Sequence, residues 1–600
     1  MCTVPITCWI VCTVMRPLLK KGLSVIDSKT STSIYLLYLK GLIKYHGRDS
    51  AQSIPSLIKK LCALANEGAW DSRIVFEESD LVRHGLSVSE LESVFLNENI
   101  FHSDIDTHTC YSFIHLSVQE FFAALYYVLD HKSVKKYFHF LKNNNVKNLL
   151  KASEDQPHLT LTVQFLFGLS SKKQIQETKK TIGCPISFRE KPILVDWLKR
   201  QSLDCHNEIL CCLYETQDEV FVGKMMSHFL NIKINILNDK KGRQENIGYR
   251  AVAYCLERST IQHSVTFYVY IIGPKARNVL SKALSKCSQL RFKRCRFPVT
   301  EDVSQAGSSL SGMFGKCQMK ELKLHSCGLT SSCCDDLRTV ITSNRSLTRL
   351  NLSFNALEDS GVKLLCEGLR HPACALEELR IRGCALTSSC CDDLCSVITT
   401  NRSLTRLDLS FNALKDSGIK RLCEGLRHPS CVLHDLMLWS CGLTSSCCDD
   451  LRSVLTTNRS LISLDLLRNN LQDSGIKRLC EGLRHPNCAL LELRLWSCDL
   501  TSSCCDDLRS VLTTNHSLTR LDLSYNSLGD SGIKLLCEGL RHPACSLEHL
   551  RLEGCGLTSS CCDDLLSVII MNNSRTRLDL TGNALENVGI KLEEPVIPPL

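Results

Sequence analysis

Leucines recur in a fixed pattern from residue 319 to residue 585. One unit reads Leu-x-x-Leu-x-Leu-x-x-Asn-x-Leu from Leu347, and a second unit, from Leu376, carries Cys at the Asn place. The two unit types alternate in steps of 28 and 29 residues, so the whole pattern returns every 57 residues. This spacing is typical of the long class of leucine-rich repeat, which has one strand and one helix per unit. The pattern therefore predicts ten repeat units in register.

Each Leu-x-Leu core predicts a short strand with its leucines pointing inward. The Asn that follows is expected to satisfy backbone groups in the turn. A helix should come next, with Ser332 as its N-cap and Asp335 as the acid of a capping box. Leu337, Val340 and Ile341 recur at helical spacing, which indicates the buried face of that helix. Because helices are bulkier than strands, stacked units are expected to form a horseshoe lined by strands on its concave side.

The outward positions of these strands form a face that the core does not dictate. Trp439 and Trp496 stand one full period apart, and arginines flank them. Trp and Arg are enriched at the energetic centres of protein interfaces, so we predict a protein-binding face here, with neutral drift of the repeat as the alternative. The predicted partner-binding residues are Arg380, Arg382, Met437, Trp439, Leu467, Arg494, Trp496 and Arg551.

Upstream of the repeats, the pattern is mainly helical. Residues 54–65 form an amphipathic stretch, residues 73–76 suggest a strand, and residues 86–95 suggest a helix. Helices around one small ribbon indicate a winged-helix-like module, and the apolar stripes after it indicate an all-helical domain. The predicted divisions are 51–130 for the winged helix, 131–250 for the helical domain, 251–318 for degenerate first repeats, and 319–600 for the regular repeats.

The number and spacing of the cysteines indicate the redox compartment of the protein. The chain has 37 Cys, and 24 of them fall from Cys327 onward, mostly at fixed repeat positions. Residues at equivalent places two units apart are too distant for disulfides, and no C-x-x-C metal motif occurs. The pattern predicts small buried thiols that pack the solenoid, which favours a reducing compartment and a cytoplasmic protein.

Charge and hydropathy exclude further classes. The formal net charge of +8 is modest for 600 residues and spread along the chain, so a nucleic-acid partner is not expected. The basic run at 291–297 contains aromatics, and we interpret it as the edge of a degenerate repeat rather than an RNA-binding segment. The apolar residues 1–15 lack a basic region and a cleavage site, so we do not expect a signal peptide. No other stretch reaches the length of a membrane span.

Four motifs carry a resemblance to a known family. They are Val-Pro-Ile-Thr-Cys-Trp-Ile-Val-Cys-Thr at 4–13, Gly-Ala-Trp-Asp-Ser-Arg-Ile-Val-Phe-Glu-Glu-Ser-Asp at 68–80, Phe-Ile-His-Leu-Ser-Val-Gln-Glu-Phe-Phe at 113–122 and Cys-Leu-Tyr-Glu-Thr-Gln-Asp-Glu at 212–219. In this order, and followed by ribonuclease-inhibitor-type repeats, they resemble the NACHT–LRR (NOD-like) receptors of the pyrin-domain branch. The resemblance implies that residues 1–50 are the end of a NACHT ATPase module.

The same resemblance implies part of an ATP or ADP site. Pro5 and Trp9 match family positions beside the base, and His115 matches the winged-helix histidine that reaches the phosphate. The P-loop pattern G-x-x-x-x-G-K-[ST] is absent from the sequence, so these residues are expected to hold nucleotide only together with a complete NACHT module.

No catalytic constellation emerges from the residues, and we expect a non-enzyme. The resemblance implies an innate immune sensor or regulator of the inflammasome type, whose repeats bind proteins such as other NOD-like receptors or an adaptor. The alternative is a free-standing ribonuclease-inhibitor-like binding module. A third hypothesis is a regulator that associates with intact receptors.

Overall fold

The computed structural model separates the chain into two compact units. One comprises residues 1–268 with 275–287, and the other comprises residues 269–274 with 288–600. The structure describes residues 10, 12, 30–46, 54–87, 95–102, 107–129, 145–184, 186, 188–202, 207–236, 245–269, 271–293, 295–297, 309–571 and 576–585. Pro5, Trp9 and most of the helix expected at 86–95 lie outside these residues.

The first unit begins with helices around a small antiparallel sheet. Its strands are β1 (Val75–Glu77), β2 (Leu96–His102) and β3 (Thr107–Phe113), in the order β1-β3-β2. The helices are α2 (Ser31–His46), α3 (Ile54–Trp70), α4 (Glu78–Arg83) and α5 (Leu116–Val128). Helices with one ribbon were predicted, and the strand expected at 73–76 is found at 75–77.

A bundle of helices follows in the same unit. Its members are α6 (Val146–Asp155), the 3-10 turn η4 (Pro157–Leu159), α7 (Thr160–Leu169), α8 (Lys172–Ile182), α9 (Lys191–Arg200), α10 (Asn207–Thr216), α11 (Glu219–Met226) and α12 (Glu245–Arg258). Phe165 of α7 packs its ring against Tyr35 of α2 and Phe121 of α5, with centroids 5.0 and 5.4 Å apart. A Cβ at Gly168 would lie 2.1 Å from the Thr32 hydroxyl, so glycine there lets α2 lie directly on α7.

Among the described residues, the larger sheet has thirteen strands, which follow one another in sequence order. It begins earlier than the sequence predicted, because β4 (Asn231–Ile236) lies inside the range assigned to the helical domain. The next elements are β5 (His263–Val269), α13 (Pro274–Ala283), η5 (Leu284–Lys286), β6 (Cys287–Lys293) and α14 (Leu310–Phe314). In the basic run, Phe292 is 0% and Phe297 is 4% exposed, and their rings pack 5.4 Å apart. These aromatics are buried in an early repeat, whereas the sequence predicted a solvated edge there.

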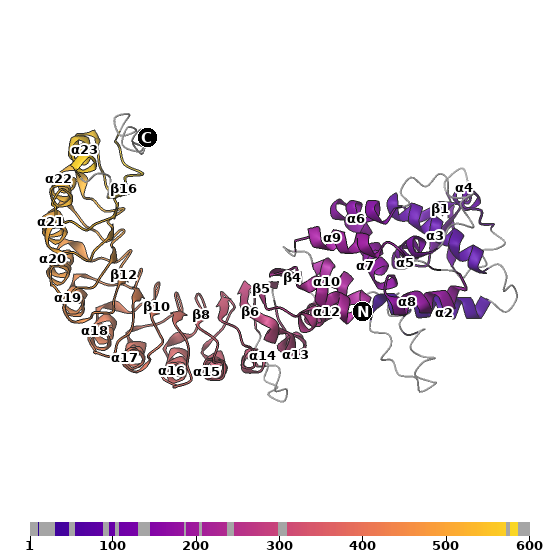
Figure 1. Ribbon diagram of the computed structural model, residues 1–600, viewed down its shortest axis with the longest axis horizontal. Coiled ribbons are helices and arrows are strands. Elements are labelled where there is room, and N and C mark those ends of the chain that lie inside the picture. The colour runs from indigo at the N-terminus through magenta and orange to yellow at the C-terminus, as the bar shows by residue number, and fades with distance from the viewer. Residues whose placement is uncertain are drawn as a thin grey trace. The chain divides into compact units, whose positions relative to one another are not determined.

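The regular repeats form an arc in which strands line the inner side and helices the outer side (Figure 1). Strands β7 to β16 pair in parallel, so Leu379 of β9 lies beside Leu407 of β10 and Leu407 beside Leu436 of β11. The strands are β7 (Glu321–His325), β8 (Arg349–Asn351), β9 (Glu378–Arg380), β10 (Arg406–Asp408), β11 (Asp435–Met437), β12 (Ser463–Asp465), β13 (Glu492–Arg494), β14 (Arg520–Asp522), β15 (His549–Arg551) and β16 (Arg577–Asp579). The helices are α15 (Cys334–Ser343), α16 (Glu358–Leu369), α17 (Cys391–Thr400), α18 (Lys415–Leu426), α19 (Cys448–Thr457), α20 (Gln472–Leu483), α21 (Cys505–Thr514), α22 (Gly529–Leu540) and α23 (Cys562–Met571). The predicted leucine-rich-repeat solenoid is confirmed.

The Asn of each Asn-type unit closes the turn as the sequence predicted. The Asn412 side-chain oxygen accepts the backbone N–H groups of Cys384 and Leu386 at 2.9 and 3.2 Å. Its amide donates to the carbonyls of Ile381 and Leu409 at 2.9 and 2.7 Å. One side chain therefore satisfies four backbone groups that the fold removes from water.

The Cys of each Cys-type unit makes a weaker version of this contact. The Cys441 thiol donates to the carbonyls of Leu409 and Trp439 at 3.4 and 3.7 Å. The cysteines that the structure describes are free thiols, and nearly all of those in the repeats are buried. Burial raises the pKa of Cys441 to about 12, which keeps the thiol protonated. The prediction of buried, unpaired thiols is confirmed for this part of the chain.

The predicted cap at Ser332 is wrong. A 3-10 turn, η6 (Ser331–Cys333), precedes α15, so Ser332 lies inside the first turn and Asp335 inside the helix. The cap is a Thr: in the next such unit, the Thr387 hydroxyl oxygen accepts the N–H of Ser389. Asp359 of the preceding unit accepts the N–H and hydroxyl of Thr387 at 2.9 and 2.6 Å. The same capped turn opens η7 (Ser388–Cys390), η8 (Ser445–Cys447), η9 (Ser502–Cys504) and η10 (Ser559–Cys561).

None of the described helices combines the length and apolar character needed to cross a membrane. No group of three or more His, Cys, Asp or Glu in the described ranges is arranged to hold a metal ion.

Candidate functional sites

A continuous row of aromatic and arginine side chains crosses the concave face of the repeats. In Cys-type units the row residue directly follows Leu-x-Leu, and in Asn-type units it directly precedes Asn. We call this set the concave row; its members are His325, Phe354, Arg382, Phe411, Trp439, Arg468, Trp496, Tyr525 and Glu553.

The first half of the row is a stack centred on Arg382. The ring centroids of His325 and Phe354 lie 5.1 Å apart, and those of Phe411 and Trp439 lie 4.6 Å apart. The Arg382 guanidinium lies 5.3 Å from the Phe354 ring, 4.2 Å from Phe411 and 4.3 Å from Trp439. Cation–π contacts of this kind attract a guanidinium to the faces of aromatic rings.

The second half of the row is centred on Arg468. Its guanidinium lies 5.8 Å from the Trp439 ring and 4.6 Å from the Trp496 ring. Trp496 in turn packs 4.9 Å from Tyr525, whose hydroxyl donates to Glu553 at 2.7 Å. The sequence predicted exposed tryptophans, whereas Trp439 and Trp496 are half-buried because arginine and aromatic neighbours cover them.

The predicted strand arginines lie on the same face but are held in ion pairs. Arg380 contacts Glu378 at 2.5 Å, and Arg494 contacts Glu492 at 2.7 Å. Arg551 lies 3.8 Å from a carboxylate of the preceding unit. Met437 and Leu467 are half-buried on this face. Of the predicted residues, Arg382, Trp439 and Trp496 therefore come together in the concave row, and the others lie beside it.

Sequence reasoning missed the row residues that precede Asn. It read only the outward strand positions and so left out Phe354, Phe411, Arg468 and Tyr525. These four have φ between +50° and +59°, the left-handed region that favours glycine. The equivalent positions in Cys-type units hold Ser or Gly. A large side chain at this position of an Asn-type unit was therefore the sequence feature that could have indicated the row.

The motif at 113–122 places His115 at the start of α5. The backbone N–H of Ser117 donates to its Nδ1 at 3.1 Å, and the Ser117 hydroxyl lies 2.7 Å from the same nitrogen. Tyr35 of α2 reaches that hydroxyl at 2.5 Å. Burial lowers the pKa of His115, so the ring is neutral near pH 7, and its proton must lie on Nε2 because Nδ1 accepts. His115 is thus a half-buried donor of one hydrogen bond.

The motif at 68–80 builds a compact ion network around α3 and α4. Arg73 contacts Glu67 at 2.6 Å and Asp80 at 3.1 Å, and Arg83 contacts the same two acids at 2.6 and 2.5 Å. The fully buried His84 lies 3.1 Å from Glu67. These ion pairs join α4 and the segment at Arg73 to α3.

The motif at 212–219 places Glu215 in contact with the first helix. Its carboxylate accepts the N–H groups of Ser31 and Thr32 at 3.0 and 2.9 Å and the Thr32 hydroxyl at 2.6 Å. Glu215 is 1% exposed, and burial raises its pKa while the hydrogen bonds from Thr32 oppose that rise. A carboxylate 183 residues away thus caps the N-terminus of α2.

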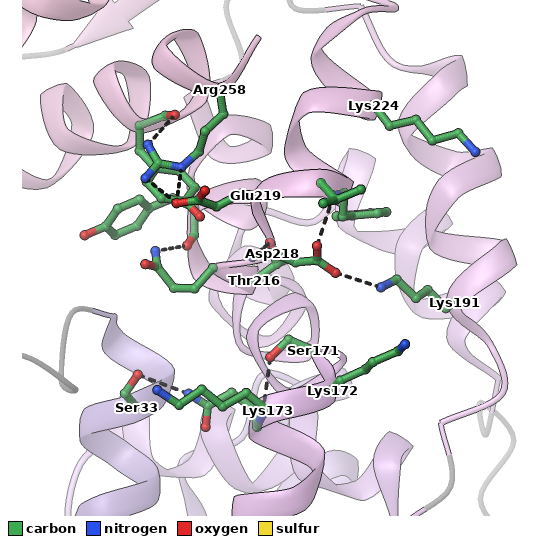
Figure 2. A pocket seen from close by; sticks show the side chains of 16 residues that line it. Ser33, Ser171, Lys172, Lys173, Lys191, Thr216, Asp218, Glu219, Lys224 and Arg258 are labelled. Carbon is green, nitrogen blue, oxygen red and sulfur yellow. Dashed lines mark hydrogen bonds and ion pairs between the residues drawn. The ribbon is translucent and has the colours of Figure 1, made fainter. Parts of the chain in front are cut away.

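A second candidate is a basic pocket of about 930 Å³ among helices of the first unit (Figure 2). Its acids are already engaged: Asp218 pairs with Lys191 at 3.3 Å and Glu219 with Arg258 at 2.7 Å. The Arg258 guanidinium also stacks 3.7 Å from the Tyr254 ring. Lys172, Lys173 and Lys224, which also line the pocket, are exposed. The pocket can attract anions but holds no buried unpaired cation aimed into it.

Known protein families match three successive parts of the chain. The model of the NOD2 winged helix domain matches residues 56–113, and that of the NLRC4 helical domain HD2 matches residues 115–224. The Leucine Rich repeat model matches four times, at 343–366, 400–423, 457–480 and 514–537. The first two models meet near residue 114, whereas the sequence placed that division at 130.

Complete relatives match almost the entire chain. Human "NACHT, LRR and PYD domains-containing protein 12" is 38% identical over 631 residues, which covers 99% of this chain and 58% of that protein. Human protein 3 of the same name is 38% identical over 607 residues, covering 99% of this chain and 56% of its own length. Human protein 14 is 34% identical over 675 residues, covering 98% and 61%. The chain therefore spans less than two thirds of each relative.

The winged helix, the helical domain HD2 and the repeats occur here in the order that the four sequence motifs indicated. Identity of 34–38% extends across nearly all 600 residues. The homologues of this chain are NACHT–LRR (NOD-like) receptors, namely the NACHT, LRR and PYD domain-containing proteins.

Proposed function

We propose that this chain acts in the cytoplasm as a NOD-like-receptor-type innate immune sensor or regulator in inflammasome-type signalling. The observation that carries this proposal is the succession of winged helix, HD2 and repeats with 34–38% identity to NACHT, LRR and PYD proteins along 98–99% of the chain. The many buried free thiols of the repeats agree with a reducing compartment.

In this proposal the first unit is part of a nucleotide-dependent switch. His115 would donate a hydrogen bond from Nε2 to a phosphate of ADP or ATP, a role that its neutral state and fixed Nδ1 support. Pro5 and Trp9 would lie beside the base. A P-loop from a NACHT module would supply the remaining phosphate contacts, since the 600-residue sequence contains no such pattern.

The repeats would bind protein partners through the concave row and so sense a ligand or hold the receptor in its resting state. Other NOD-like receptors or a signalling adaptor are the partners that this role implies. A free-standing ribonuclease-inhibitor-like module is the weaker alternative, because such a module has no use for a winged helix and HD2.

The test begins with the complete transcript, followed by nucleotide binding to the protein it encodes. We expect an upstream P-loop and ADP retention by the purified protein. His115→Ala should weaken ADP binding roughly tenfold or more, the value of one hydrogen bond to a charged group. His158→Ala, at an exposed histidine of the same unit, is the matched control and should leave binding unchanged.

The opposite result would be a transcript that starts at Met1 and a protein that binds no ADP. In that case the nucleotide-switch role would be rejected, and the chain would be a repeat-based regulator.

A further inference from the structure

We propose that the concave row binds an extended acidic segment of a partner protein. Two partner carboxylates would lie on the guanidinium groups of Arg382 and Arg468, and an apolar side chain between them would lie on Trp439. The inference rests on the proposed protein-binding role of the repeats and goes beyond it by stating the chemistry of the partner.

The first support is the difference between two sets of arginines on one face. The strand arginines are neutralised: Arg406, for example, contacts Asp435 at 2.6 Å, and Arg520 lies 3.5 Å from Glu492. Within the described residues, Arg382 and Arg468 have no carboxylate within 4.0 Å and contact only rings. The row therefore carries two positive charges that form no direct ion pair with a described carboxylate.

The second support is the backbone that carries the rings. Phe354 and Phe411 have φ of +59° and +56°, whereas glycine occupies the equivalent place at Gly383 and Gly554. A large side chain in the left-handed region costs about 1–2 kcal/mol. The fold does not require aromatic residues there, because neighbouring units use Ser or Gly, so the rings serve the surface.

The third support is the solvent exposure and hydrogen bonding of side chains in the concave row. Phe354 and Tyr525 remain 43% and 48% exposed, an unusual fraction for aromatic rings. The Nε of Arg382 and the indole N–H of Trp439 are shielded from water and have no acceptor among the described residues. The two unsatisfied donors show that the stack is kept at a cost to stability. Exposed aromatic rings beside arginines have the composition of the energetic centres of protein interfaces.

The spacing of the two guanidiniums suits an extended chain. Arg382 follows β9 and Arg468 follows β12, three strand steps apart, which is roughly 14 Å at about 4.8 Å per step. An extended peptide rises about 3.3 Å per residue, so acids four residues apart would reach both groups. Residues i, i+2 and i+4 of a strand share one face, so the middle residue would meet Trp439 between the two arginines.

The neighbouring carboxylates favour a peptide over a nucleic acid. Asp408, Asp465 and Asp522 occupy the outward strand positions beside the row. A continuous phosphate backbone would meet these acids as well as the arginines. A peptide can place its few acids on Arg382 and Arg468 alone.

The experiment selects peptides from a phage-displayed random 12-residue library on the full chain. We expect the selected peptides to carry Asp or Glu at positions i and i+4 with an apolar residue between. Replacing both acids by Gln or Asn should abolish measurable binding. Arg382→Ala with Arg468→Ala should raise Kd at least about thirtyfold, given roughly tenfold for each charged hydrogen-bonding group.

Arg406→Ala with Arg520→Ala is the matched control, because it removes two arginines of the same face that already have partners. It should change Kd less than threefold. Arg382→Lys with Arg468→Lys keeps the charge but not the planar stack, and its binding should fall between the two. Equal thermal midpoints would show that the variants remain folded.

The proposal is overturned if no peptide is selected, if selected peptides lack paired acids, or if the control pair weakens binding as much as Arg382 and Arg468. It is also overturned if single-stranded oligonucleotides displace the peptides and bind more tightly. ADP retention and its response to His115→Ala report on the receptor function separately. Loss of peptide binding with ADP binding intact would reject only the acidic-segment proposal.

Discussion

Adjacent residues in the Asn-type units serve opposite purposes. Asn412 is 5% exposed and satisfies four backbone groups, while Phe411 beside it lies on the concave face against Arg382 and Trp439. The Asn recurs in every such unit, but the residue before it is Phe, Phe, Arg, Tyr and Gly in turn. The repeat units of this chain can thus be compared with one another position by position. A position that holds the same residue in every unit is required by the fold, and a position whose residue differs between units lies on a surface that can acquire a specific function.

The largest expected effect is Asn412→Ala. It leaves the N–H groups of Cys384 and Leu386 and the Ile381 carbonyl without the partner that Asn412 supplies, and leaves the Leu409 carbonyl with only the long Cys441 thiol contact. The free energy of unfolding should fall by roughly 3 kcal/mol or more. Urea denaturation followed by circular dichroism measures the loss. Asn470→Ala, at the exposed residue after the equivalent Asn469, is the control and should cost little. If both variants lost the same stability, the interior role assigned to Asn412 would be incorrect.

Next is a pH effect at Asp465, an outward strand residue on the concave face. Burial raises its pKa to about 6, although a hydrogen bond from Leu467 and the charge of Arg494 oppose the rise. The pKa of Asp465 is higher in the folded state than in the unfolded state. Its contribution to the free energy of unfolding is therefore complete below pH 4 and is lost as the pH rises through 6. Asp465→Asn should remove a decline on the order of 2 kcal/mol between pH 4 and pH 7. Identical pH profiles for both proteins would contradict this expectation.

Cys441→Ala tests the weaker form of the turn. The thiol makes long contacts to two carbonyls and fills a small buried space, so its truncation should cost about 1–2 kcal/mol. This is less than the loss at Asn412. Thermal unfolding of the two variants side by side gives the order. A larger loss at Cys441 would reverse the ranking of the two unit types.

The smallest stability effect is expected for Phe354→Gly. Relief of the left-handed backbone offsets the lost ring contacts and the added flexibility of glycine, so the free energy of unfolding should change by less than about 1 kcal/mol. Binding of peptides selected on the concave row should nevertheless weaken. A stability loss like that of Asn412→Ala would make Phe354 part of the core and not of a binding surface.

The sequence was sufficient for features that repeat and insufficient for features that join units. Periodic leucines predicted the solenoid, and the Asn turn followed from hydrogen-bond needs. The true cap was missed because a 3-10 turn precedes the helix and moves the cap from the Ser to Thr387. The contact of Asp359 with Thr387 joins two units, so no local pattern reveals it. Only part of the concave row was predicted. Arg382, Trp439 and Trp496 follow from the outward positions of the strands. The residues that pack against them lie in neighbouring units, at backbone positions in the left-handed region, and were missed.

Charge was the other feature that the sequence could not resolve. The sequence does not distinguish Arg380, Arg382 and Arg494. Only the structure shows that Arg380 and Arg494 form ion pairs, whereas Arg382 packs on aromatic rings. In the first unit, the motif containing His115 indicated a phosphate contact, while its tautomer followed only from the Ser117 N–H.

The cap that Glu215 forms on α2 has a consequence for how this protein can be divided. A shortened product that began after His46 would leave the Glu215 carboxylate with neither of its N–H donors nor the Thr32 hydroxyl. That group would have to take up a proton or draw water into the bundle. Residues 31–46 are therefore an obligatory part of any autonomously folding helical domain, and protease-resistant fragments of this region should retain α2.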